Sequence, residues 1–157
     1  MNEVELRETC LELMATAEAV YLATVEPDGY PRIRAMLNLR NRSQYPDHTA
    51  LYEGHDDDFM VYISTNTSSK KREDIGANPR IGLYYCKPAK FLGMSLVGDV
   101  EIAEDVATKE AVWADGWERY FPTTGRPDDP DYTLLRLYPK SARGWTGSET
   151  FEITFDR

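Results

Sequence analysis

Three arginines share one side of a segment that alternates like a β-strand, and this arrangement could bind an anion. Alternation with a period of two puts Arg32, Arg34 and Arg40 on one face of residues 32–40. The opposite face is apolar and consists of Ile33, Ala35, Leu37 and Leu39. Cations this close together repel one another unless an anion lies across them. The alternative is the solvated outer face of an antiparallel sheet, which the pattern taken alone favours.

A second group of cations follows a cluster of hydroxyl side chains. Lys70, Lys71 and Arg72 fall in the first turn of a helix expected at residues 67–77. Helix starts normally favour acidic residues, so the order of charge here is reversed. A phosphate at this position would accept hydrogen bonds from free backbone N–H groups, hydroxyls and lysines together. The alternative is an ordinary helix cap followed by solvated lysines.

The overall charge makes both basic groups more informative. The 157 residues contain 18 Lys plus Arg against 27 Asp plus Glu, which gives a net charge of −9. A protein this acidic repels nucleic-acid backbones and anionic membranes, so any anion site must be a local basic cluster. The 41% of hydrophobic residues exclude a disordered chain, and two cysteines are too few for a disulfide framework.

No recognised catalytic motif accompanies these clusters. The sequence lacks a glycine-rich dinucleotide fingerprint, a Walker A loop, a zinc-protease helix and a serine nucleophile elbow. His48 and His55 lie near an acidic stretch at residues 56–58, where a solvated turn is favoured over a weak metal site. Because no side chain is an evident acid, base or nucleophile, a bound cofactor is expected to carry any chemistry.

Short strands joined by turns must position these residues. Pro27 and the Asp-Gly pair after it form a turn that joins the first two strands into a hairpin. Strands are expected at 19–25, 30–40, 50–53, 59–65, 80–86, 91–102, 133–138 and 150–155. Helices are expected at 3–17, 67–77 and 104–121, the last interrupted at Gly116. This order favours a mainly β (α+β) antiparallel sheet or barrel in a single domain, residues 1–157.

The expected core follows from the same alternation. The residues expected to be largely buried are Val20, Leu22, Ile33, Met60, Tyr62, Ile81, Leu83, Leu96 and Val100. The helix at 3–17 is expected to pack over one end of the barrel. No apolar run is long enough to span a bilayer and no signal peptide is visible, so a cytoplasmic location is expected.

Several runs resemble the pyridoxamine phosphate oxidase-like, FMN-binding split-barrel family, in the style of its small general-stress-protein branch. They are residues 20–25, 28–31, 34–36, 62–71, 78–81, 91–101 and 138–145. The resemblance covers about residues 5–147. It implies an antiparallel Greek-key split β-barrel with flanking helices, an FMN cofactor, and a homodimer with flavin between the protomers.

The resemblance also assigns residues to the flavin. Arg34 matches the arginine that holds the FMN phosphate, and Ala35 and Met36 match residues whose main chain backs the ring. The remaining matches are Ser64 and Thr65 near the ring or ribityl chain, Ser69, Lys70 and Lys71 at the phosphate, and Trp145 as a cofactor contact.

The chain departs from the oxidase itself at three places. Leu39 stands where the oxidase has a lysine, Gly93 stands where it has a glutamine, and its C-terminal Arg-x-His substrate motif is missing. We therefore do not expect oxidation of pyridoxamine phosphate. Two classes of function remain: an FMN-dependent oxidoreductase acting on a small substrate, or a non-catalytic stress-related module that binds flavin, haem or a deazaflavin.

The late aromatic residues suggest a wall for a substrate pocket. Trp117, Tyr120 and Phe121 would offer a flat apolar surface, with Arg126 or Arg143 as the nearby cation. That combination would suit a planar substrate with one negative charge. The alternative, slightly favoured, is that these aromatics pack the core or a dimer interface and contact no ligand.

Overall fold

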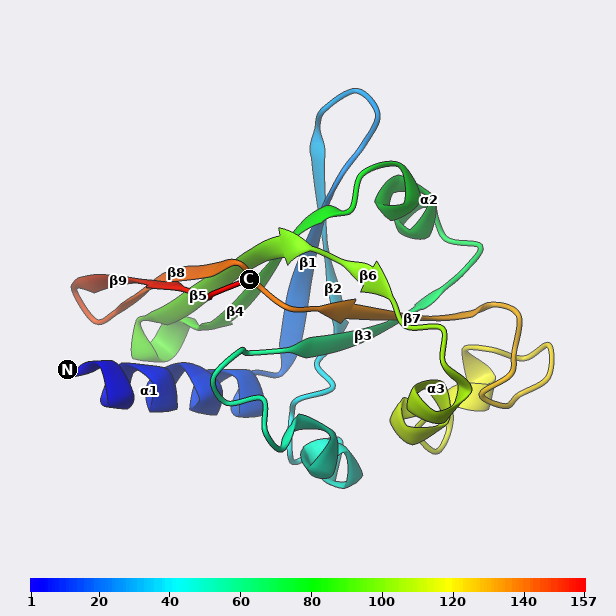
Figure 1. The fold of residues 1–157 in the computed structure, drawn as a ribbon, viewed down its shortest axis with the longest axis horizontal. Helices are drawn as coiled ribbons and strands as arrows, with labels where there is room; N and C mark the ends of the chain where they lie inside the picture. The colour runs from blue at the N-terminus through cyan, green and yellow to red at the C-terminus, as the bar shows by residue number, and fades with distance from the viewer.

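Two antiparallel sheets build the protein, as a computed structural model of all 157 residues shows (Figure 1). The larger sheet has six strands in the order β2-β1-β4-β5-β8-β9, and the smaller has the order β3-β7-β6. The strands are β1 (Ala19–Val25), β2 (Pro31–Leu37), β3 (Val61–Asn66), β4 (Arg80–Lys87), β5 (Leu92–Asp99), β6 (Glu101–Ile102), β7 (Tyr132–Leu137), β8 (Ser141–Thr146) and β9 (Glu149–Thr154). This architecture is a split barrel, as expected.

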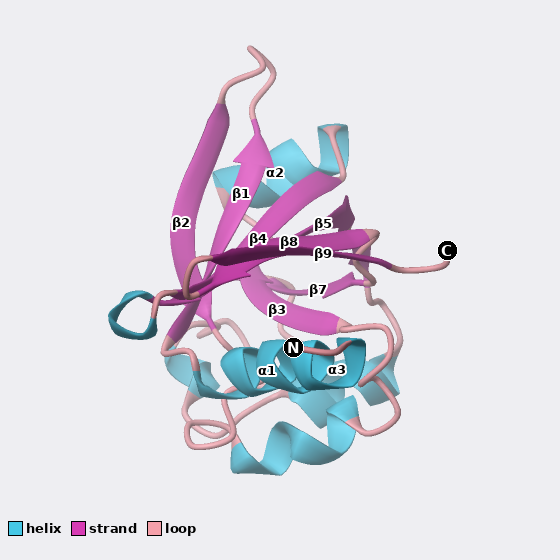
Figure 2. Cartoon of the chain, turned by 90° about the vertical axis from the view of Figure 1, so that its left-hand side faces the viewer, coloured by secondary structure: helices cyan, strands magenta, loops and turns pink.

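Short helices flank the sheets. The α-helices are α1 (Glu3–Thr16), α2 (Lys70–Ala77) and α3 (Val106–Val112), and the 3-10 helices are η1 (Pro46–Tyr52), η2 (Pro88–Lys90) and η3 (Trp117–Arg119). The β1–β2 hairpin projects beyond the body of the molecule with α2 beside it, while α1 and α3 lie toward the opposite end (Figure 2). No helix has the length and apolar character needed to cross a membrane.

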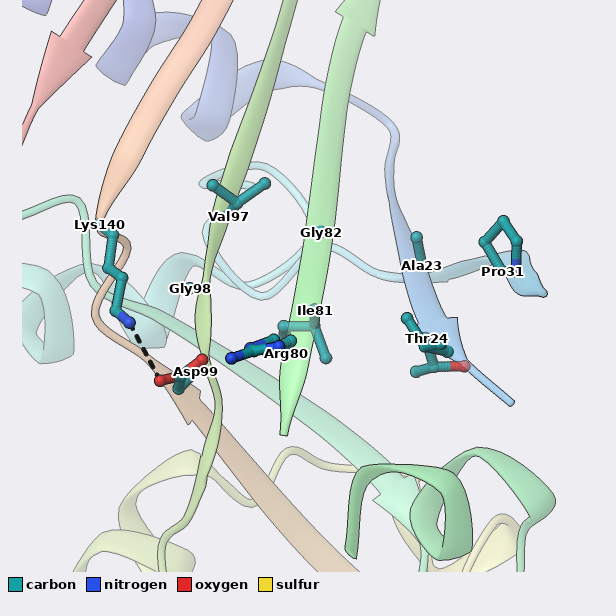
Figure 3. A pocket seen from close by; sticks show the side chains of 11 residues that line it. Ala23, Thr24, Pro31, Arg80, Ile81, Gly82, Val97, Gly98, Asp99 and Lys140 are labelled. Atoms are coloured by element: carbon teal, nitrogen blue, oxygen red, sulfur yellow. Dashed lines mark hydrogen bonds and ion pairs between the residues drawn. The ribbon is translucent and has the colours of Figure 1, made fainter. Parts of the chain in front are cut away.

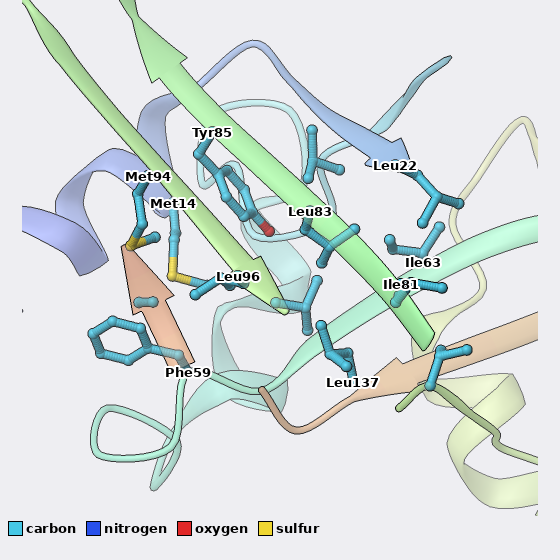
Figure 4. Close-up of a cluster of buried hydrophobic side chains, with 14 of the residues drawn as sticks. Met14, Leu22, Phe59, Ile63, Ile81, Leu83, Tyr85, Met94, Leu96 and Leu137 are labelled. Carbon is cyan, nitrogen blue, oxygen red and sulfur yellow. The ribbon is translucent and has the colours of Figure 1, made fainter. Parts of the chain in front are cut away.

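The main core lies between the inner face of the large sheet and one face of the small sheet (Figure 4). Leu22, Leu83 and Leu96 contribute to it from the large sheet, and Ile63 and Leu137 from the small one. A second cluster, including Tyr62 and Leu134, covers the other face of the small sheet. Both faces of β3 are buried over its first half, which accounts for the three successive apolar residues Val61, Tyr62 and Ile63 before the strand becomes polar at Ser64.

One predicted core residue is wrong. All the others on that list are buried, but Ile33 is 70% exposed. Its strand is turned the other way: Arg34 lies opposite Leu22 on the inner face, and Ile33 lies opposite Ala23 on the outer face. Met36, also inward, packs against the main core. In the middle of β2, Arg34 and Met36 therefore face the protein, and Ile33 and Ala35 face outward.

The remaining differences concern element boundaries. Residues 50–53 are not a strand: residues 50–52 belong to η1 and Glu53 caps its end, while Pro46 stands in its first turn, where proline fits a helix start. The helix expected at 104–121 ends at Val112, and η3 begins after Gly116, whose φ of 87° no helix accommodates. Strand β8, over residues 141–146, was not expected because its sequence SARGWT has little β-forming character.

Candidate functional site

Arg34 projects from the inner face of β2 and is held by neutral oxygens only. Its Nη1 donates to the Thr24 hydroxyl at 2.7 Å and to the carbonyls of Arg32 and Leu22 at 3.1 and 3.2 Å. Neither its Nε nor its Nη2 has a hydrogen-bond partner, and no carboxylate lies within ion-pair distance. Burial lowers the pKa of the guanidinium. Arg34 is thus anchored on one side and free on the other.

Lys71, at the start of α2, lies close enough to Arg34 for the two charges to interact. Burial lowers the pKa of the Lys71 ammonium, and the positive charge of Arg34 lowers it further. Lys71 makes no ion pair or hydrogen bond within the chain. Two partly desolvated cations, neither of which has a carboxylate within ion-pair distance, disfavour their own charged forms, and a bound anion would relieve that cost.

The backbone of α2 supplies unused donors at the same place. The N–H groups of Lys70 and Lys71 have no acceptor in the chain. Ser69 caps the helix: its hydroxyl accepts from the Arg72 N–H at 3.3 Å and donates to the Asn66 carbonyl at 2.7 Å. Free N–H groups at a helix start carry partial positive charge and are a preferred position for phosphate. We call Arg34, Ser69, Lys70 and Lys71 the basic cluster.

Lys70 differs from the other members of the basic cluster because it already has acidic partners. Its Nζ donates to Asp74 Oδ1 at 2.7 Å, and Glu73 Oε2 lies at 3.8 Å. The hydrogen bond to Asp74 raises the pKa of the lysine. Lys70 is expected at the phosphate from the resemblance, and its ammonium contacts Asp74 in this structure.

Ser64 and Thr65, which the resemblance assigns to the flavin, lie near the end of β3 that precedes the basic cluster. Thr65 is buried, and its hydroxyl lies 3.5 Å from that of Ser69. Ser64 is half-buried and lies opposite Leu134 on β7. Strand β3 therefore connects the basic cluster to the interior between the sheets.

Strand β2 offers backbone as well as Arg34. It pairs only with β1, so its other edge keeps unpaired main-chain donors and acceptors. Met36 is half-buried and inward, whereas Ala35 is exposed on the outer face. The resemblance implies that the main chain of these two residues contacts the flavin ring. The unpaired edge of β2 leaves backbone groups available for such contacts.

Trp145 is not brought to the basic cluster within one chain. It lies on β8, across the sheet from β2 and on the outer face, while Arg34 lies on the inner face. Its ring stacks at a tilt near Tyr84, with centroids 6.0 Å apart. A Cβ at Gly93 would lie 2.7 Å from the indole, so the glycine leaves room for the ring over the neighbouring strand.

The outer face of the large sheet is uncovered and carries exposed apolar side chains, which the sequence pattern did not indicate because Ile33 was expected to face inward. Its exposed large hydrophobic residues are Tyr21, Ile33, Val97 and Trp145, and the Arg143–Glu152 ion pair lies on the same face. A shallow hollow of about 390 Å³ lies at one end of it (Figure 3). Arg80 and the Lys140–Asp99 ion pair, 3.1 Å long, border this hollow, and no member of the basic cluster lines it.

The predicted aromatic substrate wall is wrong for two of its three residues. Trp117 and Phe121 are 2% and 3% exposed and pack with Tyr132 in the second core cluster. Only Tyr120 is exposed; its carbonyl accepts from the Asn66 side chain at 3.0 Å. Packing of the core, the alternative given above, therefore accounts for the buried pair.

The two histidines lie in unrelated surroundings. His48 is buried and stacks on Tyr45 with ring centroids 5.0 Å apart, and burial lowers its pKa. His55 pairs through Nδ1 with Asp58 at 3.0 Å. Neither ring makes a hydrogen bond or ring contact with the basic cluster.

Comparisons with known proteins agree with this geometry. The family model described as pyridoxamine 5'-phosphate oxidase matches residues 6–146. A Clostridium acetobutylicum protein related to general stress protein 26 of Bacillus subtilis is 31% identical, with a TM-score of 0.75 over 98% of this chain and 96% of that one. No curated relative matches the sequence.

Two further solved structures share the fold at lower sequence identity. General stress protein 26 from Bacillus anthracis is 22% identical with a TM-score of 0.69, covering 95% of this chain and 99% of that one. A heme binding protein from Mycobacterium smegmatis is 15% identical with a TM-score of 0.67, covering 94% of this chain and 57% of that one. The match over residues 6–146 and the 31% identical structure together establish that this chain belongs to the pyridoxamine 5'-phosphate oxidase family.

Proposed function

We propose that the protein binds FMN as a homodimer and works as a flavin-dependent oxidoreductase on a small substrate. One observation carries the proposal: Arg34 and Lys71 are partly buried, neither has a carboxylate within ion-pair distance, and the hydrogen bonds of Arg34 within the chain use Nη1 alone and go to neutral oxygens. The free N–H groups of Lys70 and Lys71 lie beside them. A phosphate monoester, with about −1.5 to −2 charges at pH 7, matches this set of donors.

The rest of the flavin would extend from that phosphate along the free edge of β2. The Ser64–Thr65 end of β3 and the main chain of Ala35 and Met36 are the groups available there. Bound flavin supplies hydride or single-electron transfer. The protein's own part is binding and orientation, since no acid, base or nucleophile belongs to the basic cluster.

The uncovered outer face supports the homodimer. Ile33, Val97 and Trp145 expose apolar surface that a second copy would cover, and contiguous patches of this kind commonly mark interfaces. Trp145 lies on that face, so it would approach a flavin held by Arg34 only across the dimer interface. We therefore include Trp145 in the proposal as a cofactor contact that the partner protomer would supply.

A non-catalytic binding module is the second candidate, and haem or a deazaflavin is the alternative ligand. The haem-binding neighbour shares the fold, but neither histidine of this chain contacts the basic cluster, which favours flavin. The test is the visible spectrum of the purified protein, followed by FMN titration and by reduction with NADH or NADPH. Failure to bind FMN would refute the proposal, and binding without accelerated reduction would favour the non-catalytic module.

A further inference from the structure

Asp74 is a buried carboxylate that the proposed chemistry does not use. It is 1% exposed, on the side of α2 that faces the sheet. Its Oδ1 accepts from Lys70 at 2.7 Å, and its Oδ2 is buried without a hydrogen-bond partner. A buried carboxylate with a free oxygen is costly, so the surroundings must compensate for its charge.

The compensating charges belong to the basic cluster. Asp74 pairs with Lys70. Among the acidic groups near Arg34, its negative charge also does most to raise the pKa of the guanidinium, which burial lowers. Along α2, Glu73 also approaches Lys70, but its side chain is 77% exposed. Arg72 extends toward the C-terminal end of the helix, where its Nη1 would lie 3.3 Å from a Cβ at Gly76.

We propose that Asp74 is the internal counter-charge of the phosphate site: it withholds Lys70 from the ligand and limits the affinity for phosphorylated flavin. The proposal rests on the proposed function. Arg34, Lys70 and Lys71 of the basic cluster against the buried Asp74 leave a formal surplus of two positive charges, which matches a phosphate dianion. Without Asp74 the surplus would be three, and Lys70 would be free to reach the anion.

This assignment predicts a gain of binding when Asp74 loses its charge. Asp74→Asn should tighten FMN binding by about tenfold, which corresponds to about 1.4 kcal/mol, and leave riboflavin binding within about twofold, since riboflavin lacks the phosphate. The double variant Asp74→Asn with Lys70→Met should lose that gain. Glu73→Gln removes the same formal charge at an exposed position, so it is the matched control and should change FMN binding by less than about twofold.

A second comparison does not depend on the fold of the Asp74 variant. In an otherwise unchanged chain, Lys70→Met should weaken FMN binding clearly less than Lys71→Met, because Asp74 already engages Lys70. Equal losses would overturn the proposal. If Asp74 has a structural role alone, Asp74→Asn should weaken FMN and riboflavin binding alike or leave both unchanged. Either result would refute the counter-charge proposal.

Inorganic phosphate separates this inference from the proposed function. Its binding is measured by the shift in melting temperature of the wild-type protein and of the Asp74 variant. If the wild type binds phosphate but not FMN, the proposed function fails, and the counter-charge is judged by whether Asp74→Asn increases the phosphate shift. If the wild type binds neither ligand, both proposals fail.

Discussion

Asp131 Oδ1 accepts a hydrogen bond from the backbone N–H of Ser68 at 2.8 Å, which ties the residue before β7 to the turn before α2, 63 positions earlier. The same carboxylate accepts from the Asn66 side chain through Oδ2 at 2.8 Å. The Asp131 carbonyl accepts from the Thr67 N–H, also at 2.8 Å. Three successive residues leading into the basic cluster are therefore fixed by one aspartate.

This contact predicts a pH-dependent contribution to stability. Burial would raise the pKa of Asp131, but hydrogen bonds from Asn66 and Ser68 outweigh it and hold the pKa below the ordinary value of 3.8. A carboxyl whose pKa is depressed by folding stabilises the protein above its unfolded pKa, and this stabilisation is lost as pH falls through the folded pKa.

We therefore expect Asp131→Asn to melt at a lower temperature than the wild type at pH 7. The difference between the two melting temperatures should start to shrink as the pH falls below about 4, and it should vanish once the pH has passed below the folded-state pKa, where the native carboxyl becomes protonated. Melting curves between pH 3 and pH 7 measure the difference. A difference that stays constant over this range would show that the charge of Asp131 contributes nothing.

Arg34→Ala should weaken FMN binding by about 1.5–3 kcal/mol, the usual contribution of a hydrogen bond to a charged group. Riboflavin binding should change much less, because the phosphate is the group that Arg34 would contact. Arg32→Ala is the matched control: Arg32 lies on the same strand but is exposed and paired with Glu26 at 2.7 Å. Fluorescence titration of both flavins against both variants measures the effect, and equal losses in the two variants would contradict the assignment.

Thr24→Val should also weaken FMN binding, by about 0.5–1.5 kcal/mol, the net contribution of one hydrogen bond. Thr24 is fully buried, and its hydroxyl accepts from Arg34 Nη1 at 2.7 Å. The valine keeps the shape but cannot accept, so Arg34 loses one anchor. Thr24→Ser keeps the acceptor and should restore binding; an affinity in the serine variant as low as in the valine variant would argue for a packing effect.

Ile33→Asp should convert the proposed dimer into a monomer. Ile33 is 70% exposed in one chain and is expected to be covered in the dimer, where a carboxylate would be buried without a partner. Val106→Asp changes an equally exposed residue of α3 and should leave the dimer intact. Sedimentation velocity distinguishes the two; a wild-type mass near the 18.0 kDa of one chain would exclude the dimer.

The sequence by itself was sufficient for two local features of this protein. The Pro-Asp-Gly turn after Glu26 is a hairpin, with Gly29 at a φ of 88° that only glycine adopts easily. The reversed charge order at Lys70 and Lys71 does fall in the first turn of a helix, capped by Ser69. Such features depend on residues a few positions apart, so propensity and spacing determine them.

Only the tertiary structure decided what these elements face. Alternation divides β2 into two sides, but it does not say which side is inward, and the apolar side of Ile33 proved to be the outer one. Arg34 is tolerated inside because Thr24 and the Leu22 carbonyl, on the neighbouring strand, accept its hydrogen bonds. The separation of Trp145 from Arg34 depends likewise on strand order. A buried charge is stable only with partners that pairing across the sheet brings together, and sequence spacing does not contain that information.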